Sequence, residues 1–457
     1  MNIVLVGAGR MGGEIALRLA DEGHDITVVD NDEECLERIA NTMDAMTLLG
    51  NGADYSVLEE AGVAEADLLI AVTDDDAVNM LCCLTGKKLG VKNTVARVRT
   101  MEYFRQMVFL KDELGLSLVL NPEQAAAAEI SRILRFPSAV KVDSFAKGRA
   151  EMVEHVVDEA SPLCGLRLDH MHSKFGNIGI LIAVVERGDQ VLIPKGDFVL
   201  RTGDVIHVVG APNAISAFFK SIGAYKRNVR NVMLVGGGRI SLYLGTYLIG
   251  SGIRVKILER NPDNCESIKE ILPKAEVLLG DGADPSVLEE EGVRSTDAFV
   301  TLTGSDQNNI ITSMFARRVG VGKVVTKVNE DTFRLMAADA KLDSFVLPKN
   351  SAAEIVVSFV RGMQRSIDTV GIESLHDIAY GKAEVIEFSI NGDAPNLGVP
   401  IRKLNIRRDT LIAAIIRNSQ CVIPGGNDTL EKHDTVIAVT TKFGMNGFED
   451  IFVDLGD

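Results

Sequence analysis

The 457-residue sequence predicts an α/β fold in tandem duplication: a Rossmann-like domain with a doubly wound parallel sheet, then a small α+β lobe, then the same pair again. The first observation is a glycine turn, VGAGRMG from Val6, that returns as VGGGRIS from Val235. The second is LLGNGADYSVLEEAGV from Leu48, which returns at nearly the same offset as LLGDGADPSVLEEEGV from Leu278. Separate landmarks that repeat with so little drift indicate an internal duplication.

Short apolar runs alternate with amphipathic stretches in the first half. NIVLVG, DITVVD, ADLLIAVT and TVARV are nearly all apolar, which is typical of parallel strands buried on both faces. The stretch from Met11 repeats apolar residues at helical spacing and ends at Gly23, a residue that suits a helix C-terminus. After Lys141 the strands are punctuated by Gly-Asp and Pro-Lys-Gly turns, which predicts the small α+β lobe.

The segment NPEQAAAAEISRILRFP, from Asn121 to Pro137, predicts a helix at the end of the first Rossmann-like unit. LPKNSAAEIVVSFVRG, from Leu347, is its counterpart in the second half. Such a helix either closes its own lobe or crosses to a neighbouring one, and the sequence leaves both possibilities open. We expect four units, whose limits are residues 1–137, 138–225, 230–365 and 370–457.

Composition narrows the class of function. Asp and Glu outnumber Lys and Arg by 64 to 48, and the net charge of −16 argues against nucleic acid or an anionic membrane as the main partner. The same charge is compatible with docking on the basic cytoplasmic face of a membrane protein. No apolar run approaches the roughly 20 residues of a membrane span and no signal sequence precedes the first strand, so we expect a cytoplasmic protein with reduced cysteines.

The first glycine turn predicts a nucleotide site. Gly7 allows the tight turn, Gly9 the close approach of a pyrophosphate, and Gly12 the close packing of helix on strand. The free N–H groups and the positive dipole end of the helix then hold the anion. Asp30 ends the next apolar run, where an acid accepts the ribose hydroxyls and disfavours a 2′-phosphate. We therefore expect NAD(H) to bind the first half.

The second glycine turn departs from this pattern. Gly236 and Gly238 are kept, but Ser241 replaces the third glycine, whose position governs packing more than phosphate contact. Glu259 supplies the acid, although Arg260 beside it weakens the argument for one form of ribose. A degenerate site retained as scaffold is the alternative interpretation.

Further candidates stand at matching positions of both halves. Arg10 and Arg239 follow the second glycine, where a guanidinium can lie over phosphates of its own site or of a neighbouring subunit; a solvated arginine is the alternative. The ends of the fourth and fifth strands border the crevice of a doubly wound sheet, although ordinary surface charge also explains their cations. The predicted nucleotide-binding residues are Gly7, Ala8, Gly9, Arg10, Met11, Gly12, Asp30, Thr73, Asp74, Arg97, Gly236, Gly237, Gly238, Arg239, Ile240, Glu259, Thr303, Gly304 and Lys327.

The sequence shows no catalytic group beside either crevice. A dehydrogenase needs a proton-transfer group near the nicotinamide, and no His, Tyr or Lys stands out there. His170 and His172 are two residues apart, point away from each other on a helix and have no third ligand nearby, so no metal site is predicted. Two nucleotide pockets without catalytic chemistry indicate sensing. An NAD-dependent oxidoreductase and a soluble redox sensor with a non-membrane partner remain the alternatives.

The doubled order of motifs resembles the TrkA family of regulatory subunits of bacterial potassium uptake systems, built from duplicated RCK-type domains. The resemblance covers essentially the whole chain, including the C-terminal lobes ILIAVVERGDQVLIPKGDFVLRTGDVIHVVG and LIAAIIRNSQCVIPGGNDTLEKHDTVIAV. It implies a non-catalytic protein that forms a ring peripheral to the inner face of the cell membrane. The ring would gate the pore subunit of a potassium transporter in response to NAD(H), with ATP or ADP as further candidate ligands.

The resemblance also bears on one pair of residues outside the glycine turns. Glu123 matches a proline–glutamate pair that in related proteins holds a cation between subunits. Lys349 occupies the corresponding position of the second half, and an ammonium group cannot ligate a cation. No such site is therefore expected in the second half, and the sequence leaves open whether Glu123 helps to bind a cation.

Overall fold

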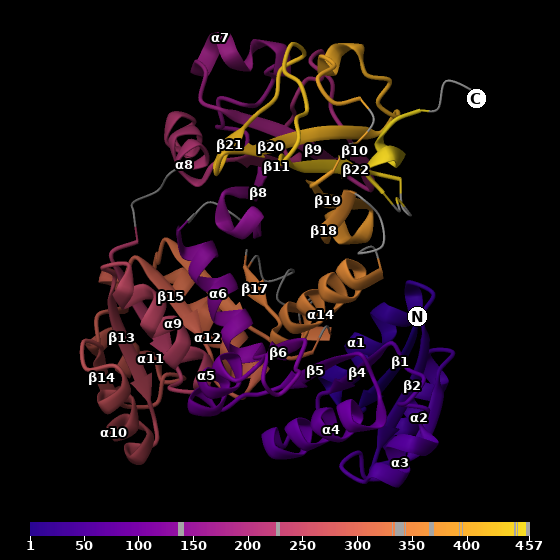
Figure 1. Ribbon diagram of the computed structural model, residues 1–457. Helices are drawn as coiled ribbons and strands as arrows, with labels where there is room; N and C mark the ends of the chain where they lie inside the picture. The colour runs from indigo at the N-terminus through magenta and orange to yellow at the C-terminus, as the bar shows by residue number, and fades with distance from the viewer. Residues whose placement is uncertain are drawn as a thin grey trace.

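The computed structural model describes residues 1–135, 141–224, 229–330, 332–333, 342, 344–364, 370–392, 394, 396–442, 445 and 447–453. Its strands form two six-stranded parallel sheets, ordered β3-β2-β1-β4-β5-β6 and β14-β13-β12-β15-β16-β17, and two five-stranded antiparallel sheets, ordered β10-β9-β11-β8-β7 and β18-β19-β22-β20-β21. The predicted α/β tandem duplication is confirmed. In Figure 1 the parallel sheets lie side by side at the bottom and the antiparallel sheets lie together at the top.

The first half contains eleven strands and eight α-helices within the described residues. Its strands are β1 (Asn2–Val6), β2 (Asp25–Asp30), β3 (Met46–Leu49), β4 (Leu68–Ala71), β5 (Asn93–Arg97), β6 (Leu118–Leu120), β7 (Val142–Phe145), β8 (Ala150–Val156), β9 (Ile180–Arg187), β10 (Gln190–Leu192) and β11 (Val205–Gly210). Its helices are α1 (Arg10–Asp21), α2 (Glu33–Thr42), α3 (Tyr55–Glu60), α4 (Asp76–Leu89), α5 (Met101–Phe109), α6 (Pro122–Arg135), α7 (Met171–Phe175) and α8 (Pro212–Ser221).

The second half repeats this order, with fewer helices among the described residues of its C-terminal lobe. Its strands are β12 (Asn231–Val235), β13 (Arg254–Glu259), β14 (Glu276–Leu279), β15 (Ala298–Thr301), β16 (Lys323–Lys327), β17 (Phe345–Val346), β18 (Val370–Ile378), β19 (Ala383–Ile390), β20 (Thr410–Arg417), β21 (Gln420–Val422) and β22 (Thr435–Thr440). Its described helices of ten or more residues are α9 (Arg239–Gly250), α10 (Pro262–Ile271), α12 (Asp306–Arg318) and α14 (Pro348–Gln364), and α11 (Pro285–Glu290) is shorter. No helix in the described part of the chain is both long and apolar enough to cross a membrane. The predicted limits between units fall at or beside residues 136–140, 225–228 and 365–369, which lie outside the described residues.

The strand order of each parallel sheet opens a crevice. The chain adds β2 and β3 on one side of β1 and then β4, β5 and β6 on the other, so the helices that follow β1 and β4 diverge at the carboxyl edge. Ligands of doubly wound sheets bind at such a reversal point. Residues 68–71 of β4 are fully buried, as expected for a strand covered on both faces.

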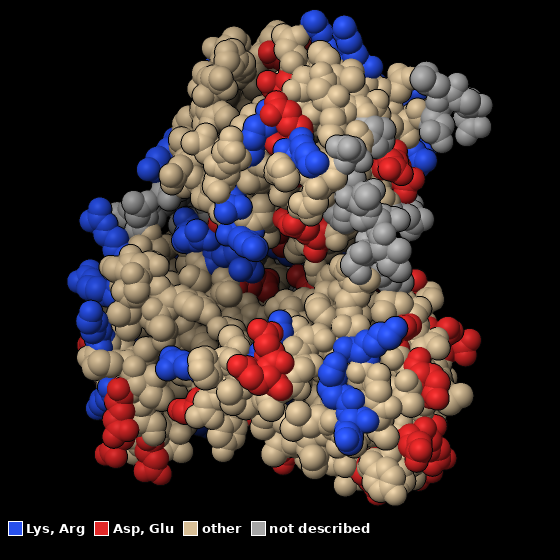
Figure 2. Space-filling model, viewed as in Figure 1, with Lys and Arg blue, Asp and Glu red and all other residues tan. Residues whose placement is uncertain are grey.

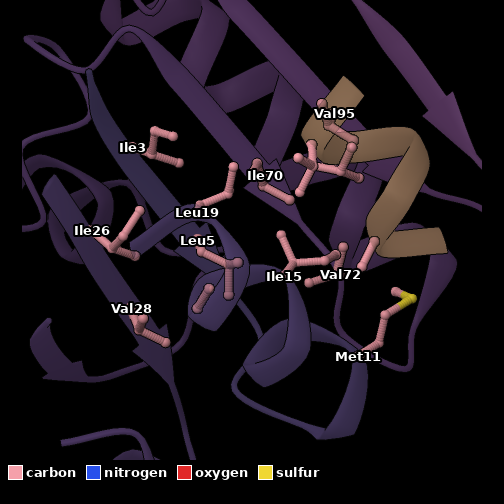
Figure 3. Close-up of a cluster of buried hydrophobic side chains, with 14 of the residues drawn as sticks. Ile3, Leu5, Met11, Ile15, Leu19, Ile26, Val28, Ile70, Val72 and Val95 are labelled. Carbon is pink, nitrogen blue, oxygen red and sulfur yellow. The ribbon is translucent and has the colours of Figure 1, made fainter. Parts of the chain in front are cut away.

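Helices α6 and α14 cross between the halves, which settles the alternative that the sequence left open. Ala352, Ala353 and Val356 of α14 are buried in the core of the first sheet, and α14 packs along α1. Reciprocally, Ala126, Ile130 and other apolar residues of α6 are buried in the core of the second sheet, against α9. Figure 3 shows the first of these cores, with a turn of α14 against the side chains of the sheet. Each parallel sheet is therefore closed by a helix of the other half.

The two antiparallel sheets also share a core. One cluster joins Phe145, Met152 and Val184 of the first C-terminal lobe to residues of the second, among them Val385 and Ile437. A polar contact reinforces the pairing, because the Ala146 N–H donates to the buried Glu387 carboxylate at 3.0 Å. The two C-terminal lobes thus form one block above the crossing helices (Figure 1).

Charged side chains gather where α6 and α14 meet this block. The Ser351 hydroxyl donates to Glu129 at 2.6 Å, and the Lys141 ammonium lies 3.3 Å from Asp143 and 3.6 Å from Glu354. Burial, reinforced by the Glu354 carboxylate, raises the pKa of Glu129 to about 7. Figure 2 shows acidic and basic groups around a recess in the middle of the molecule, between the upper block and the lower lobes.

Replacement of Glu129 by Gln tests this junction. The unfolded chain loses the Glu129 proton near pH 4.5 while the folded chain keeps it to about pH 7, so stability falls as pH rises through this window. Glu129→Gln keeps an acceptor for Ser351 and removes the titration, so the loss of stability between pH 5 and pH 8 becomes smaller. Denaturant midpoints at pH 5 and pH 8 measure this loss of stability, and Glu102→Gln on α5 is the control. Equal pH dependence in the unsubstituted protein and both variants would contradict the prediction.

Candidate functional site

The two glycine turns lie at the carboxyl ends of β1 and β12, at the reversal point of each sheet. Gly7 has φ +107° and Gly236 has φ +100°, a region that favours glycine. A Cβ on Gly7 would lie 2.9 Å from the Thr73 backbone nitrogen, and one on Gly12 would lie 1.8 Å from the Gly7 carbonyl oxygen. The first turn therefore accepts no side chain at either position.

Ser241 shows how the second turn differs. It stands where the first half has Gly12, is fully buried, and donates its hydroxyl to the Gly236 carbonyl. The first half has only the close packing of Gly12 on the Gly7 carbonyl at this place. Serine in the second turn therefore adds a hydroxyl bond to the carbonyl of its own turn.

The acids at the ends of β2 and β13 brace their own glycine turns. Asp30 accepts hydrogen bonds from the Ala8 N–H and, at 2.9 Å, from the Asp32 N–H. Glu259 repeats the arrangement, with Gly237 N–H at 2.7 Å and Asn261 N–H at 2.8 Å.

The longer acid is matched by a smaller residue in the turn. A Cβ on Gly237 would lie 2.9 Å from the Glu259 carboxylate oxygen and 2.3 Å from the Ile268 side chain. The first half has Ala8 at the same position, beside the shorter Asp30. Glycine is therefore required at this position in the second half and not in the first.

Two buried asparagines that the sequence analysis missed fix the loops after β4 and β15. The Asn79 side-chain oxygen accepts from the Thr73 N–H at 2.8 Å and hydroxyl at 2.7 Å, and its amide donates to the Thr73 and Arg97 carbonyls at 3.0 Å each. Asn309 makes the same four contacts with Thr303 and Lys327. Their recurrence at matching positions of the repeat was the signal that could have revealed them.

The cations that end β5 and β16 are not ordinary surface charges. Arg97 is buried and its guanidinium donates to the Thr73 carbonyl and to Asp74, both at 3.1 Å. The Lys327 ammonium donates to the Thr303 carbonyl at 2.9 Å. Burial lowers the pKa of both side chains, so each is a partly desolvated cation aimed at the crevice.

Glu123 and Lys349 begin the crossing helices inside the crevice and do not resemble each other. One Glu123 oxygen accepts from Arg99 at 2.7 Å, and the other is buried with no hydrogen-bond partner among the described residues. The Lys349 ammonium lies 3.2 Å from Glu14 on α1. Within the described residues, no three His, Cys, Asp or Glu side chains gather as metal ligands.

The two crevices open toward each other. A cavity of about 940 Å³ is lined by Gly9, Arg10 and Arg97 of the first half and by Arg239 and Lys327 of the second. A second cavity, of about 470 Å³, lies within the second half around Glu259 and shares Gly238 and Gly304 with the first. Of the predicted residues, Gly7, Gly9, Arg10, Met11, Asp30, Thr73, Asp74, Arg97, Gly238, Arg239, Ile240, Gly304 and Lys327 line the larger cavity, and Gly236, Gly237, Gly238, Glu259, Thr303 and Gly304 the smaller. Ala8 and Gly12 line neither and act through the shape of the turn.

Charged groups of one half also shift the pKa of residues in the other half. Burial opposes ionisation of Asp76, yet hydrogen bonds from the Arg99 and Thr100 N–H groups, together with the charge of Arg239, hold the pKa of Asp76 below its usual range. Arg10 of the first half likewise adds to the lowering of the Lys327 pKa. The structure thus places each turn arginine near the site of the opposite half.

Both parallel sheets have the strand order 3-2-1-4-5-6, with a glycine turn after the first strand and an acid at the end of the second. This arrangement defines a protein of the Rossmann class with two such units in one chain. Family models described as the TrkA-N domain match residues 3–122 and 232–348, and models described as the TrkA-C domain match residues 152–223 and 385–453. The chain belongs to the TrkA family.

Curated relatives match over nearly the full length. The Trk system potassium uptake protein TrkA of Halomonas elongata is 32% identical, and the alignment covers 99% of this chain and 98% of that protein. TrkA of Vibrio alginolyticus is 30% identical, over 96% and 95% of the two chains. A solved structure described as the GsuK channel bound to NAD shares the fold, with a TM-score of 0.62 at 18% identity over 96% of this chain and 77% of that chain.

Gly12→Ala and Gly9→Ala form a matched pair that tests the packing of the first turn. The added methyl at Gly12 meets the Gly7 carbonyl, so this variant loses about 1–3 kcal/mol or more of unfolding free energy. At Gly9, the N-cap of α1, an added Cβ meets nothing within 4 Å, so only the poorer capping by alanine costs stability, about 0.5–1 kcal/mol. Urea denaturation measures both values, and equal losses would contradict the assigned packing.

Proposed function

We propose that this protein is a non-catalytic regulatory subunit that binds NAD(H), with ATP or ADP as further ligands, and gates a membrane potassium transporter. The observation that carries the proposal is the cavity of about 940 Å³ into which both glycine turns open. Its volume lies within the roughly 300–1,000 Å³ of small-molecule sites. The full-length likeness to Trk system potassium uptake proteins supports the potassium transporter as partner.

The lining of the larger cavity matches the chemistry of a dinucleotide. Gly9 lies at the N-terminus of α1, where free N–H groups and the helix dipole attract a pyrophosphate. Asp30 stands at the ribose end, and its carboxylate, with Asp32 beside it, repels a 2′-phosphate. Arg10, Arg97 and their counterparts from the second half supply cations for the phosphates. The cofactor-binding residues predicted from the sequence are those we assign to the two sites.

The crossing helices α6 and α14 connect the nucleotide cavity with the C-terminal lobes. Pro122 and Glu123 at the start of α6, and Pro348 and Lys349 at the start of α14, line the larger cavity. The same two helices carry Glu129 and the other charged groups that contact the C-terminal block. A nucleotide that binds two arrangements of the halves unequally shifts the equilibrium between them, and a tenfold bias corresponds to about 1.4 kcal/mol.

Symmetry supports a homo-oligomeric ring, and charge supports its docking on a membrane transporter. We infer that units 1–137, 138–225, 230–365 and 370–457 of several chains build a closed homo-oligomeric ring, as pseudosymmetric repeats permit. The net charge of −16 suits the Lys- and Arg-rich inner face of a membrane transporter, to which the ring binds peripherally from the cytoplasm.

Asp30→Ala and Gly9→Val test the nucleotide site. Asp30→Ala removes a charged acceptor for the ribose hydroxyls and therefore weakens NADH binding about 10- to 100-fold. Valine at Gly9 fits the empty turn and blocks the pyrophosphate, so this variant remains folded and loses NADH binding. Isothermal titration calorimetry measures both, and Glu37→Ala on the exposed face of α2 is the control. Unchanged NADH affinity in both variants would contradict the assignment.

The partner is tested by affinity capture from detergent-solubilised membranes, without nucleotide, with NADH and with ATP. We expect a potassium transporter to co-elute, and nucleotide to change either its amount or the flux through it. Failure to retain any membrane protein in all three conditions would overturn the regulatory proposal and favour a soluble sensor or an enzyme.

A further inference from the structure

We propose that the contact between Glu22 and Arg361 is a joint through which the first Rossmann-like domain, and not the second, controls the position of the C-terminal block. The inference rests on the proposed function, because it assumes that a nucleotide bound at the first glycine turn displaces α1. It deepens that function by naming the half that sends the response and the contact that carries it.

Arg361 connects three parts of the molecule. Its guanidinium faces both carboxylate oxygens of Glu22, the residue that caps the C-terminus of α1, with N–O distances of 2.7 and 3.0 Å. The same guanidinium donates to the Leu375 carbonyl of β18 at 3.2 Å. Because Arg361 lies on α14, one side chain links the first Rossmann-like domain, a crossing helix and the second C-terminal lobe.

The joint is built to keep its geometry. Only 9% of the Arg361 side chain and 22% of the Glu22 side chain are exposed. A two-point contact between guanidinium and carboxylate is directional as well as strong, and a partly buried pair is little screened by salt. Burial lowers the pKa of the neighbouring His24, helped by the N-terminal ammonium and by Arg361. The imidazole is therefore neutral at neutral pH, and the charge of Glu22 is met by Arg361.

A second ion pair holds the other end of the same two helices, which lie side by side (Figure 1). Lys349, near the start of α14, lies 3.2 Å from Glu14 of α1. Lys349 also lines the larger cavity, and Glu14 follows closely on Gly9, the N-cap of α1. Because α1 and α14 are tied at both ends, a displacement of α1 at the glycine turn carries α14 with it.

The second half lacks both ties. The repeat places Tyr243 and Ser251 where α1 and its cap have Glu14 and Glu22. After Arg239, α9 carries no charged residue, so the rest of this helix has no group for an ion pair with α6. The Ser251 hydroxyl donates back to a carbonyl of α9 at 2.9 Å.

The equivalent arginine of α6 contacts a different element. Arg135 occupies the position of Arg361 in the repeat, and its guanidinium donates to Glu151 of β8 at 2.7 Å. The contact between α6 and α9 uses apolar packing and neutral hydrogen bonds, such as that from Asn121 to the Tyr243 hydroxyl at 3.0 Å. Such contacts lack the two-point geometry of a guanidinium–carboxylate pair, so the second Rossmann-like domain is coupled less firmly to the C-terminal block.

Hydrogen exchange of the intact protein, with and without NADH, tests the joint. In the unsubstituted protein we expect NADH to slow exchange around the first glycine turn and, by about fivefold or more, in β18. Glu22→Gln keeps the size of the side chain and removes its charge, whereas Arg361→Lys keeps the charge and removes the two-point contact. Both variants still bind NADH and still show slower exchange at the glycine turn, but they lose the response in β18.

Two matched controls accompany these variants. Arg18→Gln removes an ion pair that stays within α1, and Tyr247→Phe removes a hydroxyl of α9 that bonds Gln124 of α6. Both controls keep the response in β18. The double variant of Glu22 and Arg361 behaves like either single variant, because both substitutions act on one contact.

The outcomes separate this inference from the proposed function. A β18 response that survives in both joint variants, that is lost equally in Tyr247→Phe, or that is missing from the unsubstituted protein although NADH binds would overturn the joint and leave nucleotide binding standing. Failure of the unsubstituted protein to bind NADH would overturn both.

Discussion

Each parallel sheet of this protein buries its apolar face only by using a helix from the other half of the chain. Val356 of α14 lies in the core beneath β1, and Ile130 of α6 lies in the core beneath β12. Because burial of such side chains is the main favourable term in folding, neither half completes its core alone. The exchange fixes the two halves face to face, and the shared cavity between their glycine turns is a direct consequence.

The repeats have diverged by coupled changes rather than by decay. Glu259 is longer than Asp30, and Gly237 replaces Ala8 to make room for it. The hydroxyl of Ser241 bonds the Gly236 carbonyl, where the first half has Gly12. The second turn therefore keeps its braced acid and gains a buried hydroxyl bond, so its conformation is held as firmly as that of the first.

The same helices that complete the cores also connect the cavity with the C-terminal block. Glu123 and Lys349 stand at their cavity ends, in different electrostatic settings, and Glu129 stands at the junction with Lys141. Each helix is thus packed at one end against the cavity and at the other against the C-terminal block, with close-packed side chains along its length.

Local sequence determined the fold class, the duplication, the glycine turns and the acids that end β2 and β13, because strand burial, turn geometry and phosphate binding each require particular residues at short spacing. Tertiary structure alone decided which sheet each crossing helix covers, since Ala-rich amphipathic faces fit either. It also decided that Arg97 is buried against the Thr73 carbonyl, that Asn79 holds the same loop, and that the two crevices share one cavity. These features depend on contacts between residues far apart in the chain, and no local pattern encodes such distances.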